Sequence, residues 1–146
     1  MKWLTLTTRG GLRKRKSFEC VYDLLGKKLL IKKQDGKRLE FNLVEIKNIL
    51  EKIKASFGDG WFPLGNNVEK LYNKTERIGL GVIVYQQKPN DTFHAQGASY
   101  LGSVLEKVGI LEWNGKSYRI KWRLRDIDIS TENIKRKLQK INYIES

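Results

Sequence analysis

The stretch that decides the fold runs Tyr100-Leu-Gly-Ser-Val-Leu-Glu-Lys-Val-Gly-Ile-Leu-Glu-Trp-Asn-Gly-Lys-Ser-Tyr-Arg-Ile120. Its first half ends a helix, because Gly109 fits the position after the last helical residue and Ile110 can pack back on the last turn. Asn114-Gly115 then predicts a two-residue type I′ turn, in which both residues take positive φ. The helix has one apolar face, formed by Ala98, Leu101, Val104, Leu105 and Val108. The stretch is therefore predicted to be a helix followed directly by a β-hairpin.

The second strand of that hairpin alternates between apolar and basic side chains. On one face we expect Tyr118, Ile120, Trp122 and Leu124, and on the other Arg119, Lys121, Arg123 and Arg125. Side chains at every second position project from the same face of a strand. A merely solvated face more often includes acidic residues, so this stripe predicts a surface that contacts phosphate groups.

Upstream of this stretch the sequence predicts three further segments. Residues 43–57 form an amphipathic helix, in which Asn42 and Glu45 have the spacing of a capping box. Residues 60–64 form a short extended piece. Asn66 with Glu69 then predicts the start of a second helix. Residues 78–85 fit either a helix or a buried strand, since their β-branched residues favour a strand and their two glycines favour neither.

The ends of the chain complete the expected fold. Strands are predicted at residues 3–7, 18–22, 29–33 and 39–43, with Asp35-Gly36 as a second type I′ turn. Ser130 is expected to cap a last helix that extends to Ile141 and turns Ile134 and Leu138 inward. We therefore predict an α+β fold, with an antiparallel β-meander over 1–42, a unit of helices and a hairpin over 43–125, and a basic C-terminal helix over 126–146.

The order of elements over 43–125 resembles the winged helix-turn-helix superfamily, whose members mostly bind duplex DNA. The resemblance covers rather more than half of the chain and consists of a pattern of residue types. It implies that the helix over about 94–108 enters the major groove and that the hairpin contacts the DNA as a wing. The polar side chains of that helix, His94 among them, would then read bases, unless it is an ordinary core helix. Gln can pair with adenine and Ser with either partner.

Charge gives an independent reason to expect a polyanionic partner. The chain has 29 basic and 16 acidic residues, a net charge of +13, whereas a net charge of about 2–8 is enough for the solubility of a small domain. Residues 1–57 carry +9, residues 58–112 carry −1 and residues 113–146 carry +5. The residues predicted to contact nucleic acid are Arg13, Lys14, Arg15, Lys16, Gln96, Ser99, Tyr100, Ser103, Lys116, Arg119, Lys121, Arg123, Arg125, Lys135 and Arg136.

Composition argues against several kinds of site. The single cysteine, Cys20, cannot form an internal disulfide and lies in an apolar run that favours a buried structural thiol. The single histidine, His94, leaves no His-based metal site, so we expect no cofactor, no metal and no catalytic residues. No signal peptide and no apolar window of membrane-spanning length is present, which predicts a cytoplasmic protein without a membrane partner.

The expected function is nucleic-acid binding, with duplex DNA preferred over RNA. The role would be transcription regulation or target recognition, by a homodimer or within a larger DNA-processing assembly. One alternative is RNA or single-strand binding by aromatic side chains of the β-meander. A second is a metal-dependent nuclease that uses Asp23 or Asp35 with Glu45 and Lys47, and a third is binding to an acidic protein. The meander aromatics considered for stacking are Trp3, Phe18, Tyr22 and Phe41.

Overall fold

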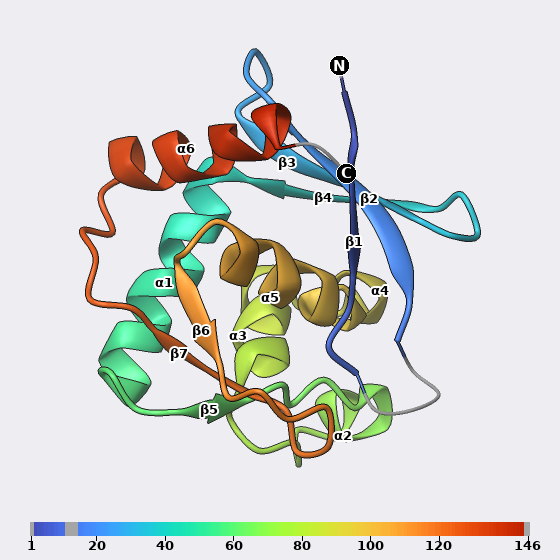
Figure 1. The fold of residues 1–146 in the computed structure, drawn as a ribbon. Coiled ribbons are helices and arrows are strands. Elements are labelled where there is room, and N and C mark those ends of the chain that lie inside the picture. The colour runs from blue at the N-terminus through green and yellow to red at the C-terminus, as the bar shows by residue number, and fades with distance from the viewer. Residues whose placement is uncertain (1, 11–14, 145–146) are drawn as a thin grey trace.

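The computed structural model describes residues 2–10 and 15–144 and has the predicted α+β architecture (Figure 1). Its N-terminal part is the expected antiparallel meander, with the strand order β1-β2-β3-β4. The strands are β1 (Leu4–Thr7), β2 (Ser17–Asp23), β3 (Lys28–Lys33) and β4 (Arg38–Asn42). Alternate side chains of these strands enter the core, as the period of two requires: Leu4, Phe18, Cys20, Ile31, Leu39 and Phe41 are all buried.

The turn between β3 and β4 differs from the predicted type. Gly36 has a φ of 85°, but Asp35 is not among the residues with positive φ, so the type I′ prediction is wrong. The amide of Gly36 instead donates to the carbonyl of Lys33 (3.0 Å), and the amide of Lys33 donates to the carbonyl of Lys37 (2.9 Å). This is a three-residue loop that places only its last residue, a glycine, in the left-handed region.

Helix α1 (Leu43–Phe57) confirms the predicted helix and half of its capping box. The side chain of Asn42 accepts a hydrogen bond from the amide of Glu45 (2.7 Å). The carboxylate of Glu45 does not return to Asn42, however. It is buried and hydrogen-bonds with Nε2 of His94 (2.5 Å), which joins α1 to α4 (Thr92–Gln96). The second half of the predicted capping box is therefore wrong, because the Glu45 side chain hydrogen-bonds with His94 and not with the amide of Asn42.

The middle of the chain contains short helices joined by loops. Residues 78–85 contribute to a helix, α3 (Leu80–Gln87), and not to a strand. The preceding helix, α2 (Val68–Tyr72), is capped by Asn67, whose side chain accepts from the amide of Lys70, so the prediction that Asn66 is the cap was wrong by one residue. The predicted helix over 94–108 is divided at Gly97 into α4 and α5 (Ala98–Lys107). Its predicted Schellman ending is confirmed, since the amide of Ile110 donates to the carbonyl of Leu105 (2.9 Å).

A small second sheet follows, with the strand order β5-β7-β6. Its strands are β5 (Phe62–Pro63), β6 (Leu111–Trp113) and β7 (Lys121–Leu124). The predicted tight turn at Asn114-Gly115 is wrong: residues 114–120 form a longer loop, and Asn114 is not among the residues with positive φ. Arg119 has a φ of 55° in this loop, so the predicted alternation begins only at β7, where Trp122 and Leu124 are buried as expected.

The C-terminal helix returns to the N-terminal sheet. Helix α6 (Thr131–Gln139) starts at the predicted cap, Ser130, and a 3₁₀ turn (Lys140–Tyr143) follows it. The Asn142 side chain donates to the carbonyl of Tyr22 (2.9 Å) and accepts from its amide (3.0 Å). These two bonds satisfy the edge of β2 beyond its last pairing with β1, which is Leu4 with Cys20.

One hydrophobic core runs from Leu4 in β1 to Ile141 after α6 and includes residues of both sheets and of α1, α3, α5 and α6. Cys20 is fully buried in it, and burial raises the pKa of its thiol to about 12. Almost no thiolate exists at neutral pH, as expected for a structural cysteine. No helix within the described part of the chain is long and apolar enough to span a membrane.

Candidate nucleic-acid interface

Helix α5, which the winged-helix resemblance predicts to read bases, is a core helix. Between residues 98 and 105 only Ser99 retains partial exposure, and the rest are buried. Tyr100 packs edge-on against Phe18 of the N-terminal sheet, with ring centroids 5.1 Å apart. The hydroxyl of Ser103 donates to the carbonyl of Ser99 (3.0 Å). His94 is buried as well. The expectation that Tyr100, Ser103 and His94 face DNA is therefore wrong for this fold.

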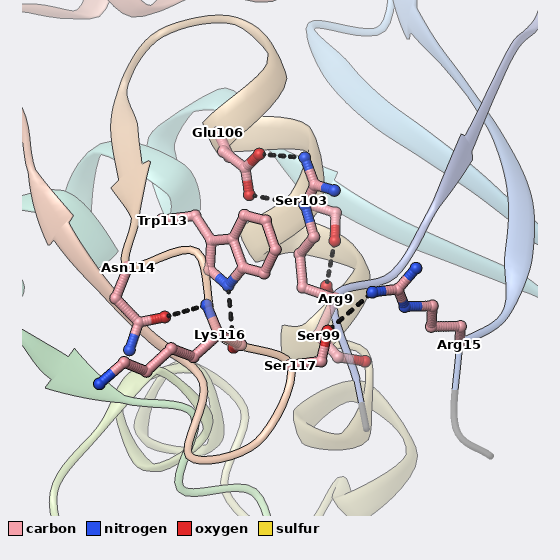
Figure 2. Close-up of polar contacts among 9 residues, drawn as sticks. All are labelled: Arg9, Arg15, Ser99, Ser103, Glu106, Trp113, Asn114, Lys116 and Ser117. Atoms are coloured by element: carbon pink, nitrogen blue, oxygen red, sulfur yellow. Dashed lines mark hydrogen bonds and ion pairs between the residues drawn. The ribbon is translucent and has the colours of Figure 1, made fainter. Parts of the chain in front are cut away.

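The N-terminal sheet packs against α5, and Arg9, which follows β1, links the two. Arg9 Nε and Nη2 donate to the two carboxylate oxygens of Glu106, at 3.2 and 2.6 Å (Figure 2). Its guanidinium also lies 4.3 Å from the ring centre of Trp113. Close by, Nη2 of Arg15 donates to Oγ of Ser117 (2.8 Å). Arg9, after β1, and Arg15, before β2, are thus attached to the end of α5 and to the loop 114–120.

An open cleft of about 1030 Å³ lies beside this attachment. Its walls come from the meander near the end of β1 and the start of β2, from the turn and helix around α2, from the α4–α5 junction and from the loop 114–120. We call it the basic cleft, and its cations are Lys16, Lys33, Lys70 and Arg77. Its uncharged polar side chains include Asn66, Asn67, Gln96, Ser99 and Ser117.

Few acidic groups oppose these cations. Among the described residues Glu76 is the one acid that lines the cleft, and its carboxylate accepts hydrogen bonds from the amides of Asn67 and Arg77, both at 2.9 Å. Lys33 lies 3.8 Å from Asp35. Within residues 2–10 and 15–144, Lys16, Lys70 and Arg77 form no salt bridge. The cleft therefore presents unpaired positive charge to an anionic ligand.

A close backbone approach builds one wall of the cleft. The amide of Gly81, in α3, donates to the carbonyl of Leu64 (2.6 Å). A Cβ on Gly81 would lie only 2.4 Å from the Gly65 carbonyl oxygen and from Cβ of Asn66. Only glycine permits this contact, which places the turn with Asn66 and the chain before α3 together at the cleft.

Some of the predicted residues meet at the basic cleft and others do not. Lys16, Gln96, Ser99 and the buried Tyr100 line it, and Arg15 is attached to its rim through Ser117. Lys135 and Arg136 lie on α6, away from the cleft, while Arg13 and Lys14 are outside the described residues. Sequence reasoning missed the lining residues Lys33, Asn66, Asn67, Lys70 and Arg77. The only signal for them was the pair Gly79 and Gly81, which marks a close backbone approach.

The stripe of basic residues predicted on the wing is shorter than expected, and an acidic residue lies on the same face of the sheet. Lys121, Arg123 and Arg125 lie on the outer face of the small sheet, whereas Arg119 and Lys116 lie in the exposed loop. On the neighbouring strand Glu112 pairs with Arg123 (2.8 Å) and lies 3.8 Å from Arg125. The expectation of a face without acids was therefore wrong, because only the pairing of strands places Glu112 there.

The residues of two alternative functions are not brought together. Phe18, Tyr22 and Phe41 are buried, so they cannot stack on bases, and Trp3 is only half-buried but lies beside Arg38. Glu45, the central carboxylate of the nuclease alternative, is buried against His94. The described residues contain no group of three His, Cys, Asp or Glu side chains that could hold a metal ion.

Comparison of the chain with protein-family models, with curated proteins and with solved structures finds no match.

Proposed function

We propose that this protein binds nucleic acid, preferably duplex DNA, by holding the phosphate backbone in the basic cleft. The observation that carries the proposal is a set of three cations, Lys16 before β2 and Lys70 and Arg77 in and after α2, that line one cleft without salt bridges among the described residues. Each phosphate that such a group neutralises releases condensed counterions, which favours binding.

The lining of the cleft favours a duplex over unstacked bases. In the part of the chain that the structure describes, Tyr100 is the one aromatic residue of the cleft, and because it is buried these residues offer no platform for base stacking. Amide and hydroxyl side chains such as those of Gln96 and Ser99 can donate hydrogen bonds to phosphate oxygens. The backbone of a duplex supplies such oxygens while its bases remain stacked.

Burial of α5 favours binding that is neutral to sequence. From α1 onward the elements follow the order α1-β5-α2-α3-α4-α5-β6-β7, and α5 has no free face for the major groove. Contacts to phosphate fix position without reading bases. The protein is therefore better suited to a structural or docking role in a larger DNA-processing assembly than to regulation at one specific site.

A salt titration tests the proposal. We expect the wild-type protein to bind two unrelated DNA duplexes with affinities within about threefold, and to bind them more tightly than single-stranded DNA or duplex RNA. Three or four phosphate contacts predict a slope of about −3 to −4 for log K against log[salt]. No duplex binding at about 50 mM salt would contradict the proposal and favour an acidic protein partner. A preference of more than about 100-fold for one duplex would contradict its sequence-neutral form.

A further inference from the structure

The outer face of the small sheet carries a second cluster, apart from the basic cleft. Phe62 of β5 pairs with Trp122 of β7, and both side chains are buried, so the residues next to them face outward. Trp61 and Arg123 are those neighbours, and the Arg123 guanidinium lies 4.6 Å from the Trp61 ring centre. Glu112, on the neighbouring strand β6, forms a salt bridge with this guanidinium at 2.8 Å.

The composition of this face is that of a base-stacking surface. Trp61 is 40% exposed, although a large apolar side chain on a surface costs free energy. Lys121 is exposed on the same face, and the side chain of Arg125 is half-exposed. An exposed aromatic ring beside arginine and lysine is the combination with which proteins bind single-stranded nucleic acid, because the ring stacks on a base and the cations meet its phosphates.

This face adjoins the basic cleft along one edge of the small sheet. Leu64 and Ile120 line the cleft, and in sequence they directly adjoin Pro63 and Lys121, which pair with each other in the small sheet. Consecutive residues of an extended chain are about 3.3 Å apart, so a nucleic-acid strand that leaves the cleft at this edge reaches the outer face within a few nucleotides.

We propose that the outer face of the small sheet, with Trp61 as its stacking residue, binds unpaired nucleotides next to a duplex held in the basic cleft. The preferred ligand is then a duplex with a single-stranded tail. This inference rests on the proposed function of the cleft and adds the class of DNA structure that the protein selects.

The test compares a blunt duplex with the same duplex carrying a short thymidine tail, at the 5′ or the 3′ end. The wild-type protein is expected to bind one tailed duplex about tenfold more tightly than the blunt one, the size of effect that one stacked base gives. Trp61→Ala is expected to lose this gain and to bind the blunt duplex as the wild type does. Trp61→Phe, which keeps an aromatic ring, is expected to retain most of the gain, and an abasic tail is expected to give none.

Each outcome separates this inference from the function of the cleft. Equal affinity of the wild type for blunt and tailed duplexes would overturn the inference while the cleft proposal stands. A tail effect that persists in Trp61→Ala, or an equal loss of blunt and tailed binding in that variant, would also overturn it. Absence of binding to the blunt duplex would contradict the cleft proposal itself. A thermal unfolding midpoint close to that of the wild type shows that each variant is folded.

Discussion

Replacement of Trp122 by alanine is expected to lower the free energy of unfolding by about 3–5 kcal/mol. Trp122 is fully buried at the centre of the small sheet, and its indole packs against Gly102 of α5. A Cβ at Gly102 would lie 2.7 Å from the ring, so the helix and the sheet fit each other at this contact. Since small domains are stable by only about 5–15 kcal/mol, this one substitution should remove a large part of the total.

Urea or guanidinium unfolding of three variants checks this prediction. Trp122→Phe keeps most of the apolar volume and removes an indole N–H that has no hydrogen-bond partner within residues 2–10 and 15–144, so it should cost much less than the alanine variant. Trp61→Ala, which removes a partly exposed tryptophan, is the matched control and should cost less than about 1 kcal/mol. Equal losses for Trp122→Ala and Trp61→Ala would contradict the described packing.

Neutralisation of three cleft cations, Lys16→Gln, Lys70→Gln and Arg77→Gln together, is expected to lower duplex affinity about 500-fold. A slope of about −0.9 per phosphate contact corresponds to about eightfold per contact at 0.1 M salt, and three such contacts multiply. The slope of log K against log[salt] should also become less steep, by about 2.7. Fluorescence anisotropy with a labelled duplex over a range of salt concentrations measures both quantities.

The matched control removes the same charge elsewhere. Lys52→Gln, Lys54→Gln and Lys88→Gln replace three exposed lysines that do not line the basic cleft. Both triple variants have three fewer positive charges than the wild-type net charge of +13. The control should lose less than about tenfold in affinity, since only long-range attraction is reduced. An equal loss in both variants would mean that net charge, and not the cleft, determines binding.

Local rules predicted the parts of the fold that local interactions determine. Asn42 and Ser130 cap their helices through their own neighbours in sequence, and the Schellman ending at Gly109 needs only the last turn of α5. Residues 80–87 could not be assigned in the same way, because this segment is apolar on most sides and shows little amphipathic pattern. Its contacts with α1 and α5 determine that it is a helix, and no local signal reports them.

The site was harder to predict than the fold, for a related reason. The cleft cations come from three distant segments, with Lys16, Lys33 and the pair Lys70 and Arg77, and only the tertiary fold brings these segments together. Net charge along the chain even pointed away from residues 58–112, where two of these cations lie. The burial of α5 was hidden in the same way, since an amphipathic pattern shows that a helix has a core face but not what packs on its other face.

Lysine footprinting tests the central claim most directly, because it locates the bound duplex on the surface of the unmodified protein. An amine-reactive ester labels exposed lysines with and without a blunt duplex, and mass spectrometry reports the reactivity of each residue. We expect duplex DNA to protect Lys16, Lys33 and Lys70 several-fold while Lys52 and Lys54 react as before. Unchanged reactivity of the three cleft lysines in a duplex-saturated sample would contradict it.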